Sequence, residues 1–229
     1  MTKIKLCGLS REEDIKAANI LMPDFIGFVF AKKSKRFISR DKAIALKKIL
    51  DPKIFSVGVF VNEKPELIAS YLEDKIIDIV QLHGNEDDDY IKTLRKFTSK
   101  PIIKAFQIRG KKNLQEAETS TADYILLDYG SGDGKIFDWS LIKNFSRPYF
   151  LAGGLNPENV SEAIATLNPF AVDVSSGIES EGFFRRYAKQ QQAEGDGTGK
   201  CGICFGKRRK KCAGCGEAEK SRGRRSACR

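Results

Sequence analysis

Eight short runs of apolar, β-branched or aromatic residues recur at regular intervals along the chain, and they constrain its fold more than any other feature. Several of these runs are apolar at consecutive positions, as expected for strands that are buried on both faces. The runs are 3–7, 25–30, 55–61, 79–83, 102–108, 124–128, 149–153 and 170–176.

The segments between these runs have helical character. Typical N-terminal signals open several of them, including a capping box and a proline that follows an asparagine cap. The expected helix starts are the capping box Ser10–Glu13, Ser39, Asn62 with Pro65 and Glu66, Asn85 in a helix that reaches Phe97, and Asn156 before Pro157.

Alternating strands and helices of this kind predict an α/β fold with a parallel sheet. Eight evenly spaced strands favour a closed (β/α)8 barrel, a TIM barrel, over the alternative of a doubly wound open sheet. In such a barrel the functional groups are expected at the carboxyl ends of the strands.

Charge and cysteine content divide the chain into two parts. Residues 1–180 hold 26 basic and 25 acidic residues, whereas residues 181–229 hold 14 and 5. We therefore expect a catalytic barrel over 1–180 and a basic Cys/Gly-rich tail over 181–229. Cys7 is the single cysteine of the first part, which predicts a reducing, cytoplasmic setting. The sequence has neither a signal-peptide pattern nor an apolar stretch long enough for a membrane helix.

Two reactive side chains stand at the ends of predicted strands. Cys7 ends the first run and Asp128 ends the sixth. In a closed barrel both point into the same mouth, where a thiol and a carboxyl suit general base and general acid catalysis. This pairing predicts an isomerase that moves protons on a small molecule.

The last two strand ends predict a phosphate site. Gly153-Gly154 follow the seventh strand, and Ser175-Ser176-Gly177 follow the eighth. Glycines allow a phosphate to approach backbone N–H groups closely, and barrels often bind phosphate with these two loops.

With these motifs in place, the chain resembles phosphoribosylanthranilate isomerases over residues 3–180. The matching stretches appear in the family's order, and the glycine-rich loop 129–134 is a small variation on the family's loop. They are 5–8 (KLCG), 34–37 (SKRF), 57–60 (VGVF), 80–84 (VQLHG), 104–106 (KAF), 127–128 (LD), 134–139 (GKIFDW), 151–160 (LAGGLNPENV) and 173–179 (DVSSGIE).

The resemblance implies an Amadori rearrangement of a phosphorylated aminoaldose, without cofactor or metal. It implies Cys7 as general base and Asp128 as general acid, and Arg36 as ligand of the anthranilate carboxylate. Substrate contacts are further expected from Gln81, His83, Gly132 and Gly134, and phosphate contacts from Gly153, Gly154, Asp173, Ser175, Ser176 and Gly177. This chemistry requires a protonated Asp128, so we expect burial to raise its pKa, and a Cys7 that loses its proton easily.

The tail departs from the family, which would continue with an amphipathic eighth helix. Residues 185–229 contain no Leu and no Val, so they cannot supply that helix, and an eighth helix is expected to be missing or replaced. A foreign or out-of-frame C-terminus is the favoured interpretation. A zinc knuckle at Cys201, Cys204, Cys212 and Cys215 is a second, and a nucleic-acid arm at 207–211 is a third, although it lacks interleaved aromatic residues.

Three other functions remain open from the sequence. The first is an impaired phosphate-binding barrel, and the second is a protein whose tail binds zinc or nucleic acid. The third is the related indole-glycerol-phosphate synthase, which the start of the first strand at residue 3 disfavours. The sequence does not predict an oligomeric state.

Overall fold

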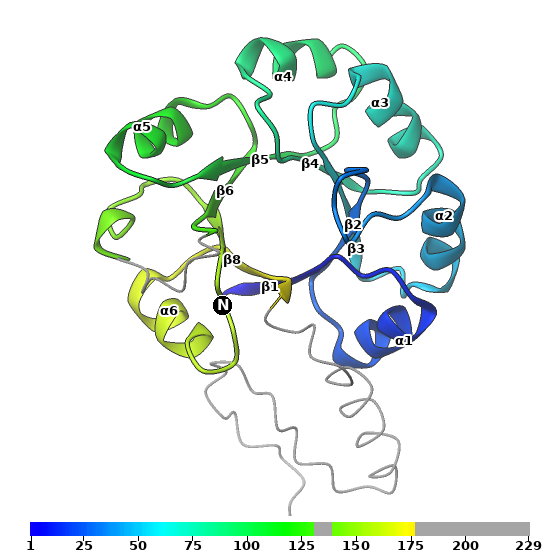
Figure 1. Ribbon diagram of the computed structural model, residues 1–229, viewed down its shortest axis with the longest axis horizontal. Helices are drawn as coiled ribbons and strands as arrows, with labels where there is room; N and C mark the ends of the chain where they lie inside the picture. Colours follow the sequence, from blue (N-terminus) through cyan, green and yellow to red (C-terminus); the bar gives the residue numbers. More distant parts are fainter. Residues whose placement is uncertain (131–138, 177–229) are drawn as a thin grey trace, which may run out of the picture.

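Eight parallel strands close into a barrel in the computed structural model, which describes residues 1–130 and 139–176 (Figure 1). Each strand pairs with its sequence neighbours, and β1 pairs with β8, Lys5 lying opposite Asp173. This pairing confirms the closed barrel and excludes the doubly wound open sheet. The strands are β1 (Lys3–Cys7), β2 (Phe25–Val29), β3 (Phe55–Phe60), β4 (Ile79–Leu82), β5 (Ile102–Gln107), β6 (Tyr124–Asp128), β7 (Tyr149–Ala152) and β8 (Ala171–Val174).

The helices form an outer ring around the strands (Figure 1). A short 3-10 helix, η1 (Trp139–Leu141), lies between β6 and β7. The α-helices are α1 (Glu12–Leu21), α2 (Arg40–Ile49), α3 (Pro65–Glu73), α4 (Asp88–Leu94), α5 (Lys111–Thr119) and α6 (Val160–Leu167). The region where the family has its eighth helix, expected here to be missing or replaced, falls within 177–229, outside the described residues, as does the whole predicted tail.

Several helix starts differ from the sequence prediction, and hydrogen bonds explain each shift. The N-cap of α1 is Arg11, because the carboxylate of Asp14 accepts from the backbone N–H groups of both Ser10 and Arg11. The carboxylate of Asp87 accepts from Tyr90 N at 2.8 Å, so α4 begins after Asp87 and not at Asn85.

Asn62 does not cap α3. Its backbone is left-handed with φ 50°, and its side chain accepts from Asn85 N, while Lys64 is the N-cap. The predicted cap Ser39 is confirmed, since its hydroxyl accepts from Lys42 N at 3.3 Å. Asn156 accepts from two backbone N–H groups of the turn before α6, whose regular part starts at Val160.

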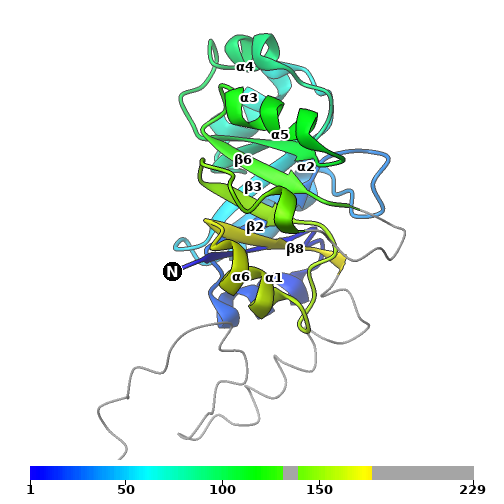
Figure 2. The same cartoon turned by 90° about the vertical axis from the view of Figure 1, so that its left-hand side faces the viewer.

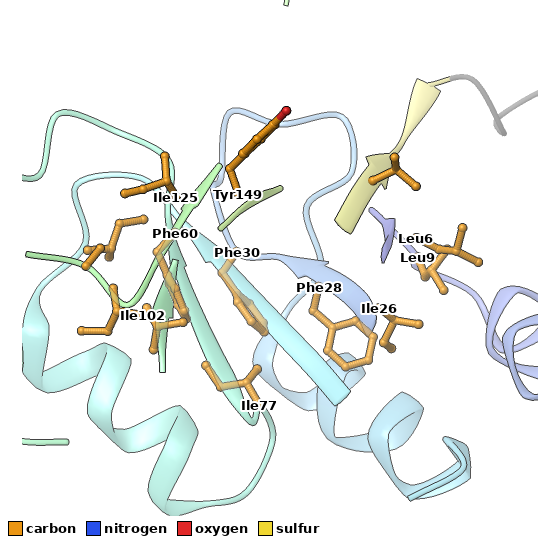
Figure 3. Packing of buried hydrophobic residues seen from close by; sticks show 14 of the residues in the cluster. Leu6, Leu9, Ile26, Phe28, Phe30, Phe60, Ile77, Ile102, Ile125 and Tyr149 are labelled. Atoms are coloured by element: carbon orange, nitrogen blue, oxygen red, sulfur yellow. The ribbon is translucent and has the colours of Figure 1, made fainter. Parts of the chain in front are cut away.

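The buried side chains form two clusters. The larger one lies between the strands and the surrounding helices and includes Leu6 and Phe28 (Figure 3). The smaller one fills the inside of the barrel with Phe25, Ile103, Leu126 and other apolar side chains. Because successive residues of a strand point to opposite faces, Leu6 points outward while its neighbours Lys5 and Cys7 point into the barrel.

The carboxyl ends of the strands face one side of the barrel, on the right in Figure 2, while the N-terminus lies on the left. Cys7, Asp128 and the residues after β7 and β8 therefore share one rim of the barrel. Among the described helices, none has the length and apolar character needed to span a membrane.

Candidate active site

A cavity of 490 Å³ opens at the carboxyl ends of the strands. This volume suits a small-molecule substrate. All of the predicted site residues that lie in the described part of the chain line it. They are Cys7, Arg36, Gln81, His83, Asp128, Gly153, Gly154, Asp173, Ser175 and Ser176.

Cys7 lies at the end of β1 and lines the cavity. Its backbone carbonyl accepts a hydrogen bond from Ser175 Oγ at 3.1 Å, which ties the ends of β1 and β8 together. The neighbouring strand presents Gly27, where an added Cβ would lie 2.6 Å from the Cys7 sulfur. Burial raises the pKa of the Cys7 thiol, although the Lys5 ammonium opposes the shift. The thiol is therefore protonated in the ligand-free protein.

Asp128 lies at the end of β6 and bonds to His83. The His83 Nε2 atom lies 3.2 Å from Asp128 Oδ2, and Gly130 N donates to Asp128 Oδ1 at 2.8 Å. Burial acts to raise the pKa of Asp128, but its interaction with His83, the Gly130 N–H and the charge of Lys5 together outweigh burial, so the pKa lies below its usual range. The expected rise was wrong, because the sequence did not reveal these two hydrogen-bond donors.

Gln81 lies behind His83 on β4. Its Nε2 lies 2.9 Å from His83 Nδ1. Among the described residues, Gln81 Oε1 is the one buried side-chain oxygen or nitrogen without a hydrogen-bond partner. A buried oxygen without a partner costs free energy unless a ligand satisfies it.

Lys5 lies beneath the cavity and pairs with Asp173, which lines it, and no role for Lys5 was expected from the sequence. The Lys5 Nζ atom lies 2.9 and 3.0 Å from the two carboxylate oxygens of Asp173. Lys5 is completely buried and Asp173 is 9% exposed. The sequence did indicate such a pair, because Lys5 occupies an inward-pointing position of an apolar strand, where a lysine needs a partner of opposite charge.

Arg36 lies in the loop after β2 and packs against Gly8. A Cβ at Gly8 would lie 2.3 Å from Arg36 Cδ, and Gly8 has φ +88°, a conformation that other residues rarely adopt. Glycine at this position therefore leaves room for the arginine side chain beside Cys7.

The loops after β7 and β8 line the far side of the cavity. Gly153 and Gly154 have φ +93° and +64°, and an added Cβ at Gly153 would lie 2.6 Å from Tyr129 N. Ser175 and Ser176 follow β8 on the adjacent strand end. Predicted ligands Gly132, Gly134 and Gly177 lie outside the described residues, as do Cys201, Cys204, Cys212 and Cys215.

A sequence model of the family described as "N-(5'phosphoribosyl)anthranilate (PRA) isomerase" matches residues 4–184. An N-(5'-phosphoribosyl)anthranilate isomerase of Endomicrobium trichonymphae is 50% identical over an alignment of 188 residues, and the match covers 80% of this chain and 92% of the relative. The chain belongs to the phosphoribosylanthranilate isomerase family.

Solved structures of this family have the same fold. The phosphoribosyl anthranilate isomerase of Thermotoga maritima is 38% identical, with a TM-score of 0.74 over 83% of this chain and 100% of that one. A phosphoribosyl anthranilate isomerase in complex with reduced 1-(o-carboxyphenylamino)-1-deoxyribulose 5-phosphate is 37% identical. Its TM-score is 0.72 over 84% of this chain and 100% of that one.

A larger cavity of 860 Å³, lined mainly by the segment after β4, by β5 and by α5, shares His83 and Asp128 with the site, but it does not reach Cys7 or Arg36. Within residues 1–130 and 139–176, no group of three or more His, Cys, Asp and Glu side chains could hold a metal ion.

Proposed function

We propose that this chain isomerises N-(5'-phosphoribosyl)anthranilate to 1-(o-carboxyphenylamino)-1-deoxyribulose 5-phosphate in tryptophan biosynthesis, with Cys7 as general base and Asp128 as general acid. The observation that carries the proposal is the placement of Cys7 and Asp128, at the ends of β1 and β6, on the wall of one cavity. Membership of the isomerase family supports the same reaction.

Two proton transfers at these residues lead to an enolamine, and a proton shift from its C2 hydroxyl to C1 completes the rearrangement. The Asp128 carboxyl donates a proton to the furanose ring oxygen, the bond from C1 to that oxygen breaks, and the nitrogen lone pair forms a Schiff base. Cys7 then removes the proton from C2, and the electron pair moves to give an enolamine. The enolamine tautomerises to the aminoketose. C1 is reduced and C2 is oxidised within the same molecule, so no redox partner is required.

The substrate itself must change the protonation of the pair. In the ligand-free protein Asp128 has a lowered pKa and Cys7 a raised one, which is the reverse of what the reaction needs. The substrate carries a phosphate and a carboxylate, and negative charge beside a carboxylate raises its pKa. The positively charged Schiff base, once formed, favours the Cys7 thiolate.

The remaining side chains of the cavity orient the substrate. Arg36 offers a guanidinium to the anthranilate carboxylate. Gln81 Oε1, which has no partner among the described residues, accepts a hydrogen bond from a substrate hydroxyl or amine. His83 holds Asp128 in place through the bond at 3.2 Å.

The phosphate is bound by the ends of β7 and β8, through backbone N–H groups at Gly153 and Gly154 and through Ser175 and Ser176. The assignment of Asp173 as a phosphate ligand is revised. Its carboxylate pairs with Lys5 Nζ and carries the same sign of charge as a phosphate, so it supports the site from below. We place the reaction in the cytoplasm, since Cys7 is the single cysteine of residues 1–180.

Substitution of the two residues tests the proposal. Cys7→Ser and Asp128→Asn should each lower kcat by about 10²- to 10⁴-fold, the range of general acid–base catalysis, with thermal melts unchanged. The matched control is Asp89→Asn, which makes the same change at an exposed carboxylate and should keep full activity. Near-normal turnover in either site variant would contradict the assignment.

A further inference from the structure

Among the described residues, Lys5 and Asp173 form one buried ion pair inside the barrel, next to largely apolar side chains. Below the active site the interior is filled by apolar side chains, including Phe25, Leu126 and Phe150. Lys5 and Asp173 lie opposite one another on β1 and β8, between this apolar filling and the cavity.

Such a pair is costly to bury. Removing an ammonium and a carboxylate from water costs several kcal/mol each, and apolar residues of similar volume often give an equally stable protein or a more stable one. Stability alone therefore does not account for Lys5 at 0% exposure. A role for its charge at the neighbouring site does account for it.

The position of Lys5 connects it with Cys7. The two residues are separated by one position on β1, so both side chains point into the barrel. The Lys5 ammonium has three N–H donors. Asp173 accepts from it with both oxygens, and the positive charge of Lys5 also acts on the Cys7 thiol.

We propose that Lys5, held by Asp173, is a positioning residue that stabilises the Cys7 thiolate from beneath the active site. This inference rests on the proposed role of Cys7 as general base. In that role the sulfur must carry a negative charge while it is partly buried, and Lys5 supplies the fixed positive charge next to it.

The charged groups that face Cys7 come from three elements. Lys5 on β1 and Arg36 after β2 act to lower the pKa of the thiol, whereas Asp173 on β8 acts to raise it. Gly27 on β2 contributes no charge. Among these charges Lys5 has the largest effect, and it opposes the rise that burial causes. The charge of Lys5 also acts to lower the pKa of Asp128 across the cavity.

Alkylation of the Cys7 thiol in the ligand-free protein tests this role without depending on the isomerase reaction. The rate of reaction with iodoacetamide follows the thiolate fraction. Mass spectrometry of the peptide that contains Cys7 separates it from the five cysteines after residue 200. In Lys5→Met the midpoint of the pH–rate curve should move up by at least about one pH unit, a tenfold lower thiolate fraction at neutral pH.

Lys5→Met leaves Asp173 buried without a partner, and this variant could fail to fold for that reason. A second variant therefore keeps the proposal testable. Lys5→Met with Asp173→Leu replaces the pair by apolar side chains and should restore the melting temperature. It should still show the raised alkylation midpoint and a lowered kcat, because the Lys5 charge outweighs that of Asp173. Lys5→Arg, which keeps a positive charge, should show a smaller shift.

An unchanged midpoint in the folded double variant would overturn the role of Lys5, even if Cys7→Ser is inactive. An active Cys7→Ser enzyme would overturn the proposed function, whatever the alkylation curve shows. The two failures are therefore distinguishable.

Discussion

His83 joins Gln81 and Asp128 in a chain of hydrogen bonds, with its Nε2 atom 3.2 Å from Asp128 Oδ2. The amide nitrogen of Gln81 lies 2.9 Å from the other ring nitrogen, Nδ1. An amide nitrogen donates, so Nδ1 accepts and the ring proton of a neutral His83 resides on Nε2. His83 thus donates to the carboxylate of Asp128 and stabilises its ionised form.

The hydrogen bonds that join Gln81, His83 and Asp128 predict that the protein takes up a proton when a ligand binds. Asp128 is ionised in the free protein, and the anionic ligand favours its protonated form. Reduced 1-(o-carboxyphenylamino)-1-deoxyribulose 5-phosphate is the probe, and calorimetry in buffers of different ionisation enthalpy measures the uptake. Uptake of up to about one proton per site should increase as the pH falls from 8 to 6.

The control for proton uptake is Asp128→Asn, which binds the same probe without the carboxyl group. Subtracting its value removes the contribution of the ligand phosphate, which itself titrates near pH 6. Equal uptake by the two proteins would contradict the protonation of Asp128 in the complex.

The value of kcat/KM should fall at alkaline pH, and only above about pH 9. In the free protein the pKa of Asp128 lies below its usual 3.8 and that of Cys7 above its usual 9.0. Between these two pKa values, a rise in pH increases the thiolate fraction of Cys7 and lowers the protonated fraction of Asp128 by the same factor. The fraction of protein molecules that have both a Cys7 thiolate and a protonated Asp128 therefore stays constant. Activity should therefore fall only above about pH 9, when Cys7 becomes fully ionised.

Initial rates at low substrate concentration, from pH 6 to 10.5, measure this fall in kcat/KM. Melting temperatures over the same range serve as the control for unfolding. A fall in kcat/KM that begins near pH 7 would contradict the raised pKa of Cys7.

Gly8→Ala should weaken substrate binding through Arg36. The new methyl group would lie 2.3 Å from Arg36 Cδ, and φ +88° adds backbone strain, so the arginine must move. Loss of one charged hydrogen-bond contact corresponds to about 1.5–3 kcal/mol, or a KM about ten- to hundredfold higher. Gly110→Ala is the matched control, since nothing lies within 4 Å of the added Cβ, and its KM should not change. A normal KM in Gly8→Ala would contradict the placement of Arg36 at the substrate.

Periodicity and glycine placement were sufficient to predict the barrel and the rim of its site. The eight apolar runs agree with the observed strands within two residues at each end, and Cys7 and Asp128 line one cavity. These features depend on local residue order, which a sequence contains directly.

The electrostatics of the site could not be predicted in the same way. The Lys5–Asp173 pair joins residues that are 168 positions apart, and their contact depends on the register between β1 and β8. The lowered pKa of Asp128 depends on the orientation of the His83 ring relative to β6. The shift from Ser10 to Arg11 at α1 likewise depends on where the carboxylate of Asp14 points.

Asp78→Asn should destabilise the barrel at neutral pH. The Asp78 carboxylate joins the starts of β3 and β4 to α2, accepting from Lys47 Nζ at 2.6 Å and from Ser56 N and Oγ at 2.8 Å each. Burial acts to raise its pKa, but the bonds from Lys47 and Ser56 hold the pKa below its usual range. Because the carboxylate is partly exposed, we expect a loss of about 1–2 kcal/mol, or roughly 2–8 °C in Tm.

The pH dependence of this loss has a defined sign. A carboxyl group whose pKa is lower in the folded state stabilises the protein above its unfolded pKa, and this stabilisation is lost as the pH falls through the folded pKa. The difference in Tm between Asp78→Asn and the unchanged protein should therefore be full above about pH 5 and should shrink below about pH 4. Asp89→Asn, at an exposed carboxylate, should melt like the unchanged protein throughout. A difference for Asp78→Asn that is the same at pH 3 and pH 7 would show that packing, and not charge, explains its effect.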